Sequence, residues 1–343
     1  MPQITSTNTD FAKIKVVGVG GGGSNAVDFM INSGLVNNVD FIAVNTDSQA
    51  LLRSNALTKL QIGSKYTRGL GSGGDPEVGR ASAEESKEQI TDLFYDTDMV
   101  FITAGMGGGT GTGATPIIAK EAKAAGALTV AVVTKPFDFE GKQRMIQAED
   151  GIEELIKHVD AYIVVPNENL IKVLDKDITL INAFNFSDDV LGQGVRGISD
   201  LITIPGKINA DFADVKNIMI DSGSLLMGLG EASGKDRAKI AAKKAVSSPL
   251  LELSIEGAKG VVFNITAGED VKLSEVTEAA KIITDCSDSD ATVIYGQTID
   301  KSQGDVIKIT VIATGFSEKK DYSHLISEDM KQDFEVPTFM RVQ

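Results

Sequence analysis

The chain has 343 residues, 42% of them apolar, and a formal net charge of −15. This length is sufficient for two hydrophobic cores, and the negative charge excludes a protein that holds nucleic acid in a general basic field. No apolar run approaches the ~18 residues that a membrane-spanning helix requires. The only cysteine, Cys286, excludes an internal disulfide and fits a reducing cytosol. We therefore expect a cytoplasmic protein with no nucleic-acid partner and no direct insertion into a membrane.

Short apolar segments alternate with helix-like segments from residue 12 to about residue 175. The apolar segments end near five positions, Val19, Val44, Ala104, Val133 and Val165. This alternation predicts an α/β fold, with a Rossmann-like parallel sheet and helices on both of its faces. Ligands of such sheets bind at the carboxyl ends of the strands.

A first glycine cluster follows the first predicted strand. Gly18, Gly20 and Gly23 fit the G-x-G-x-x-G fingerprint of dinucleotide-binding proteins. In a nicotinamide enzyme, Asp47 at the end of the next strand would hold the ribose. An NAD-dependent oxidoreductase is therefore one reading of this segment.

A second glycine cluster, GMGGGTGTG, occupies residues 105–113. It lies between a strand-like segment, Met99–Thr103, and a helix-like segment, Ala114–Glu121, in which Pro116 suits a first helical turn. A glycine loop between a strand and a helix presents free backbone N–H groups to phosphate. Two such loops after separate strands predict one triphosphate held from two sides. Because the chain has no G-x-x-x-x-G-K-[ST] motif, backbone amides, helix dipoles and a metal would meet the phosphate charge.

The second half of the chain predicts a long helix followed by a smaller α+β domain. Apolar residues at helical spacing predict one helix over residues 178–203, which Pro205 and Gly206 end. Beyond it we expect helices over 214–227 and 236–247, and strands over 260–267, 291–297 and 306–313, the last two paired antiparallel.

Several segments together resemble one family. Residues 107–113, GGGTGTG, are similar to the signature of the tubulin/FtsZ family. Further segments that resemble this family are VNTD at 44–47, PEVGR at 76–80, TKPF at 134–137, NADFAD at 209–214 and SPLL at 248–251. The resemblance runs in order from about residue 12 to about residue 316. It is strongest to the bacterial members, which are cell-division GTPases, with archaeal tubulin-like cytoskeletal GTPases as a near alternative.

The resemblance implies a division of the chain. Residues 12–177 would form the GTP-binding domain, 178–203 the central helix, 204–214 a catalytic loop and 215–316 the C-terminal domain. The flanking parts would be a disordered N-terminus (1–11), a linker (317–333) and a C-terminal partner-binding peptide (334–343).

The resemblance also implies a GTP/GDP site. Gly21, Gly22, Gly23, Ser24 and Asn25 would contact the phosphates with Asp47 nearby, and Gly108, Gly109, Thr110 and Gly111 would wrap the β- and γ-phosphates. Glu140 and Arg144 would hold the ribose and the base edge, Asn167 and Asp189 would read guanine, and Phe184 would stack on it. Mg²⁺ would accompany the nucleotide, with a monovalent cation as a further candidate. Without the resemblance, Phe184 also fits a core residue and Asp189 a solvated helix residue.

Catalysis would require a second subunit. In this family the loop that contains Asn209, Asp211 and Asp214 enters the nucleotide site of the neighbour, so the chain would polymerise head to tail and hydrolyse GTP in the polymer. Asp214 also fits the N-cap of the next helix, and a non-catalytic scaffold stays an alternative. Residues 334–341 would recruit membrane-anchor division proteins such as FtsA, at the division site on the inner face of the membrane.

Overall fold

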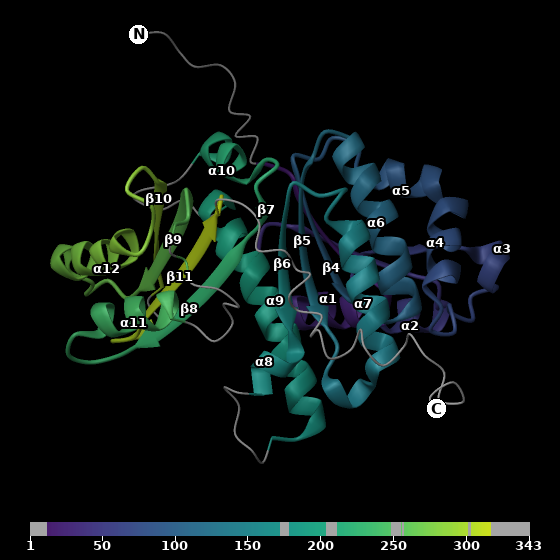
Figure 1. Cartoon of the computed structure of the whole chain (residues 1–343), viewed down its shortest axis with the longest axis horizontal. Helices are drawn as coiled ribbons and strands as arrows, with labels where there is room; N and C mark the ends of the chain where they lie inside the picture. Colours follow the sequence, from purple (N-terminus) through teal and green to yellow (C-terminus); the bar gives the residue numbers. More distant parts are fainter. Residues whose placement is uncertain are drawn as a thin grey trace, which may run out of the picture.

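The structure is a computed structural model, and it describes residues 12–171, 178–203, 211–247, 255, 257–300 and 303–316. It contains two sheets with a long helix between them (Figure 1). Residues 1–11, most of the predicted catalytic loop with Asn209, and the tail from residue 317 lie outside the described residues.

The N-terminal sheet has seven strands, all parallel, in the order β3-β2-β1-β4-β5-β6-β7. Its strands are β1 (Ile14–Val19), β2 (Asp40–Asn45), β3 (Thr58–Gln61), β4 (Met99–Gly105), β5 (Leu128–Lys135), β6 (Ala161–Pro166) and β7 (Gly223–Ser224). The predicted parallel α/β sheet is confirmed. The strand order reverses between β1 and β4, and ligands of open parallel sheets bind at that point. Both predicted glycine loops follow these two strands.

Helices cover both faces of this sheet. They are α1 (Gly20–Ser33), α2 (Ser48–Arg53), α3 (Ser64–Thr67), α4 (Pro76–Glu85), α5 (Lys87–Leu93), α6 (Gly109–Ala124), η1 (Asp138–Glu140), α7 (Lys142–Leu155), α8 (Asn167–Ile171) and α9 (Leu180–Thr203). Successive side chains of a strand point to opposite faces. Val16 accordingly packs in one core with α1 and α9, and Val17 in a second core with α5, α6 and α7. The strands are therefore buried on both sides, which explains their continuous apolar runs.

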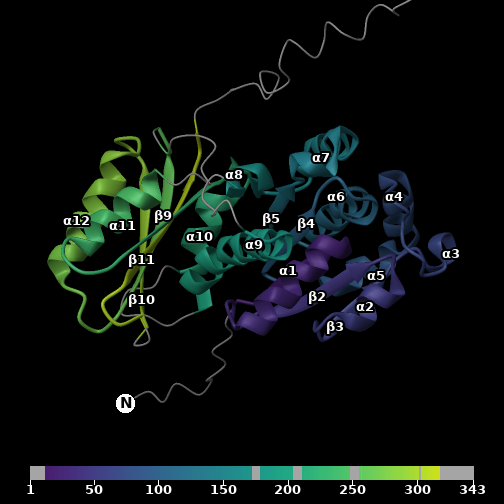
Figure 2. The same cartoon turned by 90° about the horizontal axis from the view of Figure 1, so that it is seen from below.

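The long helix α9 belongs to both domains. Val195 on α9 packs in the same cluster as Ile163 of the N-terminal sheet and as Val262 and Ile312 of the C-terminal sheet. Figure 2 shows α9 lying between the two sheets. A Cβ added to Gly197 would lie 2.8 Å from the Thr310 methyl carbon, so a glycine lets the helix approach the C-terminal sheet closely. This arrangement confirms the predicted central helix.

The C-terminal domain is a four-stranded sheet with helices on its outer face. Its elements are α10 (Phe212–Met219), β8 (Leu226–Ala232), α11 (Arg237–Val246), β9 (Gly260–Ala267), α12 (Leu273–Asp285), β10 (Thr292–Ile299) and β11 (Ile307–Thr314), with the strand order β10-β9-β11-β8. None of the helices in the described part of the chain is long and apolar enough to cross a bilayer.

Two expectations for this domain were wrong. The helix predicted over 214–227 ends at Met219, because Asp221 and Gly223 both take positive φ and turn the chain into β7, which β8 then follows. The strands predicted over 291–297 and 306–313 do not pair with each other. Instead β9, buried along its whole length, lies between β10 and β11, and the α12 crossover makes β10 parallel to β9.

Candidate nucleotide site

The second glycine cluster is a short loop followed by the first turns of a helix. Gly107 has φ +97° and Gly108 is the N-cap residue, whereas Gly109–Gly113 already belong to α6. Pro116 therefore lies inside α6 and not in its first turn, contrary to our expectation. The helix starts early because glycine allows a close contact with α4. A Cβ on Gly113 would overlap the carbonyl oxygen of Pro76, and one on Gly79 would overlap that of Gly109.

The two predicted phosphate loops lie against each other. A Cβ on Gly20, which has φ +71° and begins α1, would come 2.7 Å from the backbone nitrogen of Gly111. The N-termini of α1 and α6, with their free N–H groups and positive dipole ends, therefore lie side by side. Added Cβ atoms on Gly21 and Gly108 would meet no atom within 4 Å, so these two backbones face open space. This arrangement suits a phosphate chain.

The first loop also holds a buried hydroxyl group without a partner. Ser24 is 4% exposed, and its Oγ has no hydrogen-bond partner among the described residues. Buried polar atoms in proteins are almost always paired. The orphaned Ser24 hydroxyl therefore fits a bound nucleotide at this place, as predicted for residues 21–25.

Several side chains predicted to hold the ribose and the base lie together where β6 ends, at the carboxyl edge of the N-terminal sheet. Asn167, 4% exposed at the start of α8, accepts a hydrogen bond from Ser187 Oγ of α9 at 2.8 Å. The Phe184 ring packs edge-on against Phe137 and Phe139, with ring centroids 5.4 and 6.4 Å away. Phe184 is 38% exposed, so it retains a free surface on which a base can stack.

Glu140 and Arg144 form part of the same end of the site. Glu140 accepts a hydrogen bond from the Phe137 backbone N–H at 3.0 Å and forms an ion pair with Arg144 at 3.1 Å. A Cβ on Gly107 would come 2.6 Å from the carbonyl oxygen of Arg144. The second glycine loop therefore adjoins the segment predicted to hold the ribose.

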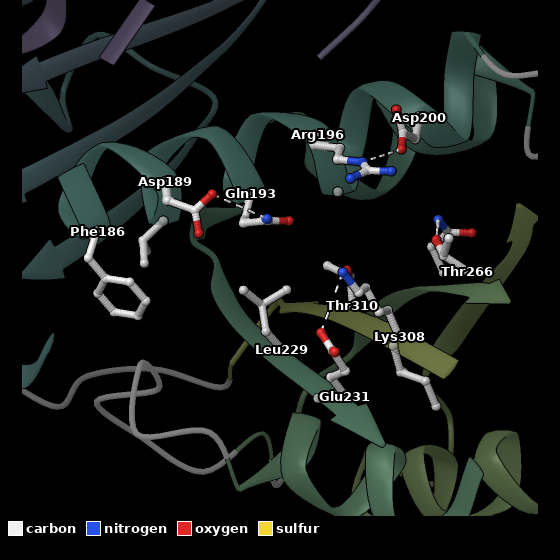
Figure 3. Close-up of a pocket in the computed structure, with 15 residues that line it drawn as sticks. Phe186, Asp189, Gln193, Arg196, Asp200, Leu229, Glu231, Thr266, Lys308 and Thr310 are labelled. Carbon is white, nitrogen blue, oxygen red and sulfur yellow. Dashed lines mark hydrogen bonds and ion pairs between the residues drawn. The ribbon is translucent and has the colours of Figure 1, made fainter. Parts of the chain in front are cut away.

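Asp189 lies elsewhere. It lines a cavity of about 340 Å³ between α9 and the C-terminal sheet, and its carboxylate accepts from Gln193 Nε2 at 3.5 Å. Figure 3 shows Asp189 on the α9 side of this cavity, which Leu229 and Lys308 line from the sheet side. Burial raises the pKa of Asp189, while the Gln193 hydrogen bond and the charges of Lys308 and Arg196 lower it. This position does not favour the predicted contact of Asp189 with guanine.

The preceding residue, Asp188, was missed by the sequence analysis. Residues four apart on a helix share a face, so Asp188 lies on the face of Phe184, next to Ser187, which contacts Asn167. Burial raises the pKa of the Asp188 carboxyl to about 7. The spacing of four residues from Phe184 is the sequence feature that could have identified Asp188.

A third glycine-rich loop, residues 69–75, was also missed. Gly69, Gly71, Gly73 and Gly74 all have positive φ. The loop pairs with the segment that follows β2, because Leu70 forms an isolated bridge with Asp47. Asp47 itself caps α2 and accepts from the backbone N–H groups of Gln49 and Ala50 at 2.8 and 3.2 Å. The high glycine content of the segment GLGSGGD is the sequence feature that could have identified this loop.

The predicted catalytic carboxylates lie far from this edge. Asp211 is the N-cap residue of α10 and Asp214 lies in its first turn, and both are exposed. The structure therefore places Asp211, and not Asp214, at the N-cap position. Phe184 lies near the start of α9, whose 24 residues span about 36 Å, and α10 follows its far end (Figure 1).

Comparison with known proteins identifies the chain. The profile described as Tubulin/FtsZ family, GTPase domain, matches residues 13–175, and that described as FtsZ family, C-terminal domain, matches residues 223–317. A solved "FtsZ dimer, empty" from M. jannaschii is 44% identical, with a TM-score of 0.84 over 89% of this chain and 88% of that chain. The chain belongs to the tubulin/FtsZ family.

Other solved members of the tubulin/FtsZ family share the fold. A point mutant of M. jannaschii FtsZ is 44% identical, with a TM-score of 0.85 over 89% of this chain and 92% of that chain. CetZ2 from Haloferax volcanii, solved as a GTPγS-bound protofilament, is 20% identical, with a TM-score of 0.74 over 93% of this chain and 98% of that chain. The match to the family's GTPase domain, which includes the first glycine cluster, supports binding of GTP or GDP by this domain and not the NAD reading.

Proposed function

We propose that this protein is a self-assembling GTPase of the FtsZ type. Its subunits polymerise head to tail into protofilaments of the cytokinetic ring, and the neighbouring subunit completes the site for GTP hydrolysis. The single observation that carries this proposal is the separation of the glycine loops from Asp211 and Asp214 by the length of α9. Related chains form assemblies, because FtsZ from M. jannaschii was solved as a dimer and CetZ2 as a protofilament.

Hydrolysis requires a water molecule positioned against the terminal phosphate. In the head-to-tail contact, Asp211 and Asp214 of one subunit would orient that water over the glycine loops of the next, with Asn209 beside them. Both carboxylates are exposed, as residues that act on a partner subunit must be. Mg²⁺ would neutralise the phosphate charge, and a monovalent cation is a further candidate.

The base would be held at the β6 end of the sheet edge. Asn167 and Asp188 offer acceptors, Phe184 offers an aromatic face, and Glu140 and Arg144 lie beside the second loop. We assign to Asp188 the role that the sequence suggested for Asp189, because Asp188 shares a helix face with Phe184. Guanine donates through N1–H and its exocyclic amine to a carboxylate, and adenine cannot offer this pair.

The domain limits inferred from the sequence and the role of the tail remain part of the proposal. Residues 334–341 form an apolar cluster within a polar segment, which suits docking into a groove of a membrane anchor such as FtsA. Cytoplasmic action at the division site on the inner face of the membrane would follow. An archaeal tubulin-like cytoskeletal GTPase is the second candidate, but the 44% identity to FtsZ from M. jannaschii, against 20% to CetZ2, supports the FtsZ type.

The direct test is GTP turnover per subunit, measured against the concentration of the full chain. We expect turnover near zero in dilute solution and a rise above a critical concentration, in step with the pelletable fraction. The same series with GDP serves as the control for assembly without hydrolysis. Turnover per subunit that stays constant on dilution would contradict a shared site.

A further inference from the structure

The two ends of α6 lie at opposite edges of the N-terminal sheet. Its first residues, Gly109–Gly113, belong to the second glycine cluster, at the carboxyl edge where β4 ends. Its 16 residues span about 24 Å, and its last turn contains Lys123. The Lys123 ammonium donates to the carbonyl oxygen of Val159 at 3.3 Å, just before β6 begins at the amino edge of the sheet.

Lys123 joins two aspartates from different parts of the chain. Its ammonium lies 2.9 Å from a carboxylate oxygen of the buried Asp160 and donates to Asp221 Oδ1 at 2.7 Å. Asp160 also accepts from the Thr129 backbone N–H at 2.8 Å, so it is fixed to the sheet. Asp221 is exposed, and the hydrogen bond and charge of Lys123 lower its pKa, so this pair is ionised at neutral pH.

Asp221 lies in the short connection between α10 and β7. Residues 220–222 alone separate Met219, which ends α10, from Gly223, which begins β7. The strand β7 is fixed to the N-terminal sheet, because it pairs with the start of β6 and the Gly223 backbone N–H donates to the Asp160 carbonyl oxygen at 3.0 Å. A change in the position of Asp221 must therefore move the end of α10.

The other contacts of α10 are mainly apolar. Val215 and Met219 are fully buried in the core that α9 shares with both sheets. A Cβ on Gly260 of β9 would lie 2.8 Å from a methyl carbon of Ile218. Apolar burial is not directional, whereas a hydrogen-bonded ion pair requires a defined direction and distance. The contact of Lys123 with Asp221 therefore adds the directional restraint on how α10 is oriented.

We propose that Lys123 is a positioning residue for GTP hydrolysis, because through Asp221 it fixes the orientation in which α10 presents its catalytic carboxylates to the neighbouring subunit. This inference rests on the proposed function. The helix α6 would thereby connect the phosphate loop of one nucleotide site to the carboxylates that complete the next site along the filament. Because Lys123 lies at the far end of α6 from the phosphate loop, loss of its contact with Asp221 should lower turnover and not the affinity for GTP.

The decisive variant of the full chain is Asp221→Asn. It removes the charge, keeps a residue type that accepts positive φ, and leaves the pair of Lys123 with Asp160 intact. Exposed ion pairs contribute little to stability. We therefore expect D221N to lower GTP turnover per pelleted subunit roughly threefold, with the thermal midpoint, the GTP affinity and the pelleted fraction of wild type. The matched control is Asp236→Asn, at another exposed aspartate with positive φ, which should turn over as wild type does.

A double-mutant cycle tests whether Lys123 and Asp221 act through one contact. Lys123→Met should lower turnover at least as much as D221N, because it also frees Asp160. The double variant K123M/D221N should lose no more than K123M alone, since the two changes remove the same contact. Lys120→Met, also exposed on α6, is the matched control and should leave turnover unchanged.

Three outcomes would overturn the inference. They are wild-type turnover in D221N, losses that multiply in the double variant, and a loss of turnover that is matched by a loss of GTP affinity or of pelleting. Any of these, in a protein whose wild-type turnover rises above a critical concentration, contradicts the Lys123 inference alone. Wild-type turnover per subunit that stays constant on dilution would overturn the proposed function and the Lys123 inference together.

Discussion

The proposed nucleotide-binding residues near the start of α9 and the proposed catalytic residues beyond its end are held in different ways. Near its start, the second glycine cluster packs so tightly against α4 that added Cβ atoms at Gly79 and Gly113 would overlap backbone oxygens. Beyond its end, Asp211 and Asp214 are exposed side chains at the start of α10. Under the proposed function, one subunit alone would bind the nucleotide, while hydrolysis would depend on the exposed surface of its neighbour.

The largest effect is expected when a carboxylate beyond the end of α9 is removed. Asp214→Ala should lower GTP turnover ~10²–10⁴-fold, because it removes a group that orients water, while the affinity for GTP stays unchanged. Steady-state turnover and direct titration measure the two effects. Asn217→Ala, also exposed on α10, is the matched control and should turn over normally. Loss of GTP binding in D214A would instead place Asp214 in its own subunit's site.

Mixing a subunit with a defective nucleotide site and a subunit with a defective catalytic residue tests whether two subunits share one site. Gly21 has open space around an added Cβ, so Gly21→Asp should place a carboxylate against the phosphates without disturbing the fold. G21D and D214A should each be nearly inactive. An equal mixture should recover up to about a quarter of wild-type turnover, because in a head-to-tail polymer that fraction of contacts joins an intact loop to an intact Asp214. No recovery in co-pelleting subunits would refute the shared site.

The binding end can be tested by comparing two adjacent residues. Asp188→Asn should reduce the preference for GTP over ATP roughly 10- to 100-fold, since a hydrogen-bonded charged group is lost. Asp189→Asn, on the face that lines the cavity, should leave this preference nearly unchanged. Titration with both nucleotides measures it. The opposite ranking of the two variants would restore Asp189 as the residue that reads the base.

The smallest expected effect is a dependence on pH. Burial raises the pKa of Asp188 to about 7 in the free protein, and the guanine donors favour its ionised form. The affinity for GTP and GDP should therefore fall as the pH falls through 7, by about tenfold between pH 8 and pH 6. D188N should remove this dependence. A wild-type affinity that does not change over this range would mean that Asp188 does not contact the base.

Much of the fold was predictable because the relevant signals are local. The strands before the glycine loops are continuous apolar runs, and the ends of β1 and β4 were placed at or within one residue. The strand β8 was not predictable in this way. Its sequence, LMGLGEA, carries no alternation, and its place is set by pairing with β11, far along the chain.

In the candidate site, the sequence could not decide which of two adjacent residues contacts the base. Composition could not separate Asp188 from Asp189, because the choice depends on which face of α9 meets Phe137 and which meets Leu229. From the sequence, Gly113 was placed in a phosphate-binding loop and Gly79 was given no role of its own. In the structure they allow α4 and α6 to touch, a contact between segments more than 30 residues apart.

The phosphate loops, residues 20–25 and 105–113, contain no lysine or arginine. Fixed amide dipoles at close range are screened much less by dissolved ions than separated surface charges are. Nucleotide capture should therefore depend less on ionic strength than capture by a site lined with lysine or arginine would. The association of two subunits should depend more strongly on ionic strength, because each carries a net charge of −15 and their mutual repulsion is long-ranged. Added salt should thus favour filament growth more than it changes nucleotide occupancy, so the ionic composition of the cell would act mainly on assembly and less on nucleotide loading.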